Sequence, residues 1–75
     1  MSAKTIPIKL SKDEALVLFE WLAEVDKLKI IPFKHPAEEK VFWKIEGILE
    51  KALVEPFDPE YKGHLDEARN RIMKE

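Results

Sequence analysis

The apolar residues between positions 15 and 25 recur too densely to lie on one face of a helix. At about 100° of rotation per residue, they occupy most of the circumference of a helix over residues 12–28. The polar side chains share a narrow sector of that helix. Such a helix needs cover on nearly every side, so the pattern predicts that it forms the centre of the core. Trp21 is the position most open to a partner.

A short arm is predicted to precede this helix. Residues 5–10 alternate apolar and other positions, which is the period of a half-buried extended segment, and Pro7 restricts that segment to an edge. Ser11 and Glu14 then have the spacing of a capping box, in which each side chain bonds the backbone N–H of the other residue. The first helix is therefore expected to begin directly after Ser11.

Two further helices are each expected to begin beside a proline, which suits the first position of a helix. Pro36 places the second helix over about residues 36–54, and Pro59 places the third over about residues 59–73. The third helix has only a thin apolar seam of Tyr61, Leu65, Ala68 and Ile72. The second is expected to bury a conventional apolar stripe, formed by Ala37, Val41, Phe42, Ile45, Ile48, Leu49, Ala52 and Leu53.

These elements predict an all-α single domain over residues 1–75, with three helices behind a short extended arm. A chain of 75 residues buries only about 60% of its unfolded surface, so we expect modest stability. The apolar connection from Ile30 to Phe33 either tucks back against the core or pairs with the arm.

Composition excludes several classes of site. The chain has 13 basic and 15 acidic residues, a net charge of −2 that is too balanced to predict binding to nucleic acid or to an anionic membrane. It has no cysteine, which excludes disulfides, thiolate zinc sites and cysteine nucleophiles. No stretch approaches the roughly 20 apolar residues of a membrane span. We therefore expect a cytoplasmic protein whose partners do not include membranes.

Candidate catalytic side chains are few, and we expect no enzyme activity and no cofactor. Ser11 is used by its own cap, and His35 is interpreted as a helix-boundary residue. The strongest metal candidate is a set of three, Glu60, His64 and Glu67, which share one face of the third helix. In a chain this rich in glutamate the same spacing is typical of a solvated face, so metal binding at these three residues is left open.

Five residues are candidates for a partner interface. Trp43 lies off the apolar stripe of the second helix, and tryptophan is enriched at binding hot spots. Gly47 follows one turn later, where glycine costs a helix about 1 kcal/mol relative to alanine, a cost that close packing often explains. With Val54, Trp21 and Val17 they would form one or two exposed apolar patches. The alternative is that the arm, the first connection and the residues around position 57 cover them.

Charge is segregated along the second helix. Lys40, Lys44 and Lys51 lie on one flank, whereas the acidic residues Glu39, Glu46 and Glu50 lie on another. The pattern is typical of a solvated helix surface, and the alternative is a stripe that a partner recognises.

Two resemblances bear on function. The alternating segment from Ile6 to Leu10 before a capped helix resembles ribbon-helix-helix repressors, whose strands pair across a dimer and enter the DNA major groove. This resemblance implies an alternative function as a DNA-binding regulator. The segment departs from the pattern of that family, because Pro7 would remove a pairing amide and Lys9 is the only polar residue that could contact the bases. The segments from Leu10 to Phe19 and from Leu53 to Tyr61 resemble a family of small bacterial helical proteins. This resemblance implies a single helical domain and says nothing about activity or substrate.

The expected function is therefore non-enzymatic. Surplus apolar helix surface and few catalytic side chains favour a protein–protein interaction or regulatory module. Such a module acts either as a homodimer or as an adaptor or inhibitor bound to another protein.

Overall fold

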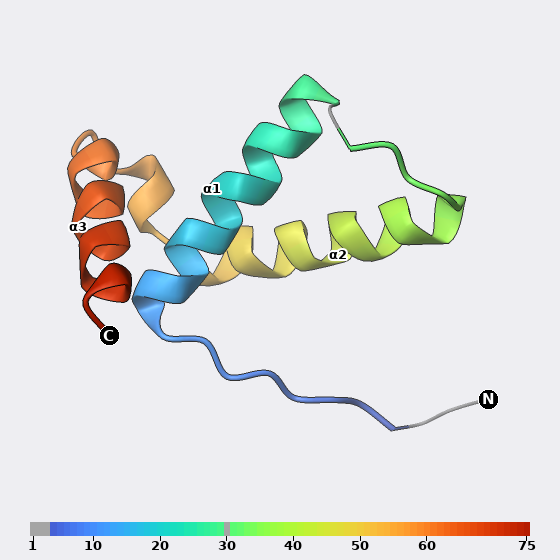
Figure 1. The fold of residues 1–75 in the computed structure, drawn as a ribbon, viewed down its shortest axis with the longest axis horizontal. Helices are drawn as coiled ribbons and strands as arrows, with labels where there is room; N and C mark the ends of the chain where they lie inside the picture. The colour runs from blue at the N-terminus through green and yellow to red at the C-terminus, as the bar shows by residue number, and fades with distance from the viewer. Residues whose placement is uncertain (1–3, 30) are drawn as a thin grey trace.

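A computed structural model describes residues 4–29 and 31–75 and shows an all-α fold (Figure 1). Its helices are α1 (Lys12–Leu28), α2 (Pro36–Ala52) and α3 (Tyr61–Met73), and a single 3-10 turn, η1 (Glu55–Phe57), joins α2 to α3. α1 packs against both α2 and α3. The dense apolar pattern of α1 thus marks the central helix, as predicted. None of the described helices is long and apolar enough to cross a membrane.

α1 begins at the predicted capping box. The backbone N–H of Ser11 donates to Glu14 Oε1 at 2.8 Å, and the backbone N–H of Glu14 donates to Ser11 Oγ at 3.1 Å. The helix ends at Leu28, and Lys29 follows in the left-handed conformation with φ 55°. There its N–H donates to the carbonyl oxygen of Val25 at 2.8 Å, which closes the last turn.

α2 begins at Pro36, as predicted, and His35 is its N-cap. The ring Nδ1 of His35 accepts from the backbone N–H of Ala37 at 2.9 Å. In the first turn of the helix, a carboxylate oxygen of Glu38 accepts from the backbone N–H of Lys34 at 2.8 Å. His35 is therefore a helix-boundary residue whose side chain satisfies a free N–H of the first turn.

Two predicted helix ends are corrected by the structure. The second helix is expected to end at about residue 54, and α2 stops two residues earlier at Ala52, because Leu53 turns to an extended conformation that buries its side chain. The third helix is expected to begin at about residue 59, and α3 begins two residues later at Tyr61. Asp58 instead accepts from the backbone N–H of Glu60 at 2.8 Å, so it stabilises a turn that precedes α3.

The core lies between α1 and its two neighbours. Ile31 and Phe33 pack against it, and the ring of Phe33 meets that of Phe42 edge-on with 5.6 Å between centroids. The connection between α1 and α2 therefore tucks back onto the core, although Ile30 itself lies outside the described residues. The predicted seam of α3 is confirmed, since Leu65 and Ala68 are buried. The buried apolar side chains are Leu16, Phe19, Leu22, Val25, Phe42, Leu49, Leu53, Leu65 and Ala68.

The predicted extended arm is present, but it is exposed and not half-buried. Residues 4–10 have no regular secondary structure and extend away from α1 (Figure 1). Ile6 is 87% exposed and Ile8 is 78% exposed. No strand occurs within residues 4–29 and 31–75, so the arm has no edge to pair with.

The predicted stripe of α2 is only partly buried. Phe42, Leu49 and Leu53 enter the core, whereas the other five positions are exposed: Ala37, Val41, Ile45, Ile48 and Ala52. The stripe is only partly buried because few other elements pack against α2. α2 packs against α1, and α3 packs mainly against α1 and η1, so one side of a wide apolar arc is left without cover.

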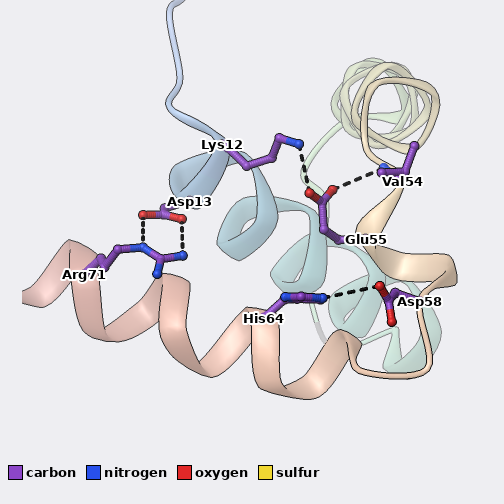
Figure 2. Close-up of polar contacts among 7 residues, drawn as sticks. All are labelled: Lys12, Asp13, Val54, Glu55, Asp58, His64 and Arg71. Atoms are coloured by element: carbon purple, nitrogen blue, oxygen red, sulfur yellow. Dashed lines mark hydrogen bonds and ion pairs between the residues drawn. The ribbon is translucent and has the colours of Figure 1, made fainter.

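Polar contacts hold α3 in place (Figure 2). The guanidinium of Arg71 donates to both carboxylate oxygens of Asp13 at 2.7 and 2.9 Å, which ties the end of α3 to the start of α1. These hydrogen bonds hold the pKa of Asp13 below its usual range. Lys12 similarly donates to Glu55 at 2.8 Å and ties α1 to η1. Arg71 makes these hydrogen bonds to α1, although Glu67 lies one turn before it on α3.

Candidate interaction surface

A hollow of about 380 Å³ lies between the arm, α1 and α2. Each residue that lines it is an isoleucine or a leucine. They are Ile6, Ile8 and Leu10 from the arm, Leu18 from α1, and Ile45, Ile48 and Leu49 from α2. We refer to this hollow as the arm groove.

The α2 wall of the arm groove continues as an exposed apolar row. Val41, Ile45, Ile48 and Ala52 occur at spacings of four, three and four residues, which places them on one face of the helix. Val41 and Ile48 are each 56% exposed. With a rise of about 1.5 Å per residue, the row is about 16 Å long. We refer to these four residues as the outer stripe.

The two sides of the outer stripe differ in charge. Its solvent edge carries Lys40, Lys44 and Lys51, and none of these three has a carboxylate partner within the described residues. The glutamates lie beyond the buried side of α2. Burial raises the pKa of Glu46, and the nearby charges of Asp26 and Glu50 add to that rise. The arm groove therefore has a basic rim along α2, and the acidic flank lies on the far side of the helix.

Trp43 makes a contact within the chain that explains its place off the stripe. Its Nε1 donates to Asp26 Oδ1 at 3.2 Å and so connects α2 to α1. Lys29 Nζ lies 3.2 Å from the same oxygen. Both hydrogen bonds lower the pKa of Asp26, and the one from Trp43 contributes the most. Trp43 is still 48% exposed, so about half of the residue remains open to solvent.

The other four predicted interface residues lie at separate places. Val17 is partly buried against the core, and Trp21 is exposed one turn later on α1. Val54 is exposed at the start of η1. A Cβ at Gly47 would meet nothing within 4 Å, so close packing within the described chain does not explain this glycine. None of the five predicted residues lines the arm groove, and their role in binding stays a prediction.

Sequence reasoning missed the outer stripe because it assigned those residues to the core. The signal was present in the width of the apolar arc. The eight apolar positions of α2 span about 160° at 100° per residue, whereas a core-facing stripe needs little more than about 100°. One neighbouring helix leaves the remainder exposed.

The three residues considered as a metal candidate do not form a metal site in the described structure. Glu60, His64 and Glu67 line an open hollow on α3, and His64 Nε2 lies 3.4 Å from Asp58 Oδ2 (Figure 2). In the part of the chain that the structure describes, no three histidine, aspartate or glutamate side chains are placed to hold a metal ion.

Comparison with protein-family models, with curated proteins and with solved structures finds no match to this chain. The arm groove and the basic rim of α2 are therefore the features from which a function is inferred.

Proposed function

We propose that this chain is a non-enzymatic protein–protein interaction module, and that its docking surface is the arm groove with the outer stripe of α2. One observation supports the proposal above others. Apolar side chains from two separate segments border one hollow and are exposed to solvent. They are Ile6, Ile8 and Leu10 on the arm, and Ile45 and Ile48 on α2.

The size of this surface fits a binding site. Full burial of an aliphatic side chain is worth up to about 3 kcal/mol at about 25 cal/mol per Å² of apolar surface. The two values together imply about 120 Å² of apolar surface for a fully exposed aliphatic side chain. By that measure the arm and the outer stripe expose on the order of 400 Å² of apolar surface. The largest apolar patch on a monomer is usually about 300–600 Å² and is often functional.

The chemistry of the lining supports binding rather than catalysis. Isoleucine and leucine side chains provide neither a nucleophile nor a group that transfers protons. They lose contact with water when a partner covers them, which is the main favourable term in protein association.

The test is affinity capture from the cells that produce the protein, with the intact chain as bait. Ile48→Glu places a charge in the docking surface, and Lys62→Glu on α3 is the matched control. Both positions are exposed, so both variants are expected to keep the wild-type circular dichroism spectrum. We expect a co-purifying protein that is lost with Ile48→Glu and retained with Lys62→Glu.

Trp43→Ala and Trp21→Ala extend the same experiment to the residues that the sequence singled out. A partner that is retained with Ile48→Glu and lost with Trp43→Ala would contradict the docking surface proposed here. A partner lost only with Trp21→Ala would place the interface on α1 and contradict it equally.

A further inference from the structure

We propose that the occupant of the arm groove is an acidic amphipathic helix of about three turns, supplied by a different protein. This inference rests on the proposed interaction function and adds the shape and the charge of the partner. Three observations carry it: the length of the outer stripe that continues the groove, the charge along its edge, and the apolar area of the arm and the stripe.

The dimensions suit a helix. The outer stripe is about 16 Å long, which is the length of three helical turns. A helix laid in an apolar groove inserts residues at positions i, i+3 or i+4, and i+7, and the four residues of the outer stripe have the same repeat. An extended partner fits less well, because Pro7 has no N–H to offer an added strand and the opposite wall is a helix.

The charge of the rim favours an acidic partner. Lys40, Lys44 and Lys51 follow the solvent edge of the outer stripe without carboxylate partners in the described chain. Lys9 lies between two groove residues of the arm. Glu38, near the start of the stripe, is engaged by the backbone N–H of Lys34. Glutamate or aspartate beside the apolar anchors of a partner would therefore meet unpaired lysines, whereas a basic partner would meet like charge.

The same rim disfavours a second copy of this chain. In an antiparallel two-fold pair of α2 helices, the row containing Lys44 and Lys51 lies on the same side in both copies, so like charges face each other. The area leads to the same conclusion. Standard interfaces bury about 800 Å² on each partner, and obligate homodimers bury more. Because a little over half of a standard interface is apolar, an apolar surface on the order of 400 Å² matches a standard-size complex with another protein and falls short of an obligate homodimer.

The experiment uses the intact chain and two fluorescent peptides of 15 residues that share leucine anchors at i, i+3, i+4, i+7 and i+11. One peptide has glutamate at the flanking positions, and the other has lysine there. Fluorescence anisotropy at low salt is expected to give at least tenfold tighter binding of the glutamate peptide. The difference is expected to shrink as salt is added, because salt screens exposed charges.

Charge reversal supplies the internal control. Lys44→Glu with Lys51→Glu is expected to reverse the preference, so that the lysine peptide binds more tightly. The matched double variant on α3, Lys62→Glu with Lys74→Glu, has the same net charge and is expected to keep the wild-type preference. Circular dichroism confirms that each variant is folded before titration.

Several results would overturn the inference. They are equal binding of the two peptides, a preference for the lysine peptide, and binding of neither peptide. A dimer in light scattering that is lost with Ile48→Glu would also overturn it, because it assigns the groove to a second copy. Failure here is distinct from failure of the proposed function: a captured protein that depends on Ile48 while both peptides fail leaves the interaction module standing and removes only the acidic helix.

Discussion

Replacing Ile48 and Leu49 separately by alanine compares the exposed and the buried face of α2 at adjacent positions. Leu49 is 8% exposed and belongs to the core cluster, whereas Ile48 is 56% exposed. A buried leucine replaced by alanine costs about 2–5 kcal/mol, since it loses transfer free energy and leaves a cavity. Ile48 buries less than half of a side chain whose full burial is worth about 1.5–3 kcal/mol. Its replacement leaves no enclosed cavity and gains helix propensity, so we expect a cost of about 1 kcal/mol or less.

Urea unfolding followed by far-UV circular dichroism measures both costs. A chain of this length is expected to be stable by about 4–11 kcal/mol, so Leu49→Ala removes a large part of the total and lowers the midpoint strongly. The slope of the free energy against urea is expected to stay the same in both variants. Equal costs, or a cost above about 2 kcal/mol for Ile48→Ala, would show that the outer stripe is buried and refute the docking surface.

Three further predictions test the rest of the account. Gly47→Ala and Gly63→Ala are each expected to raise the free energy of unfolding by about 0.5–1 kcal/mol, because both glycines lie in helices and an added Cβ meets nothing within 4 Å. A lower free energy of unfolding in urea would show instead that the glycine is closely packed. Ser11→Ala is expected to lower the free energy of unfolding by about 1 kcal/mol, because the capping box is lost. A variant whose thermal unfolding midpoint equals that of the wild type would contradict this. Asp13→Asn is expected to lower stability at neutral pH. Arg71 lowers the pKa of Asp13 in the folded chain. The stability that the pair contributes is therefore present above the unfolded pKa of about 4 and is lost as pH falls through the lower folded pKa. A difference in unfolding free energy between wild type and variant that does not narrow in acid would contradict the pair.

The helices could be predicted because their end signals are local. Ser11 and Glu14 lie one turn apart, and Pro36 begins a helix whose first N–H groups need no internal partner. The proline rule placed the start of the third helix at about Pro59, two residues before α3 begins. An aspartate before a proline suits both a helix cap and a turn, and here it accepts from the N–H of Glu60 in a turn before α3.

The faces of the helices were harder to predict, because burial depends on which elements become neighbours. The apolar arc of α2 was visible in the sequence, but the sequence does not show that α3 would pack mainly on α1 and η1. The outer stripe was therefore assigned to the core. The arm was assigned a covering role for the same reason, whereas Ile6 and Ile8 are exposed.

Contacts between distant residues were beyond sequence reasoning. Arg71 binds Asp13 across 58 positions, although a closer glutamate was available at i−4. Tyr61 Oη donates to Glu20 at 2.9 Å across 41 positions, and burial is the main reason that the pKa of Tyr61 is raised. The hydrogen bond from Trp43 to Asp26 is of the same kind and accounts for a tryptophan whose place looked unexplained.

Site-specific photo-crosslinking in the producing cells tests the docking surface most directly. A photoreactive amino acid is placed at position 48 in the outer stripe and, as control, at position 62 on α3. The account predicts an adduct with a different protein from position 48 and none from position 62. Adducts of equal yield from both positions, or only with a second copy of this chain, would contradict it.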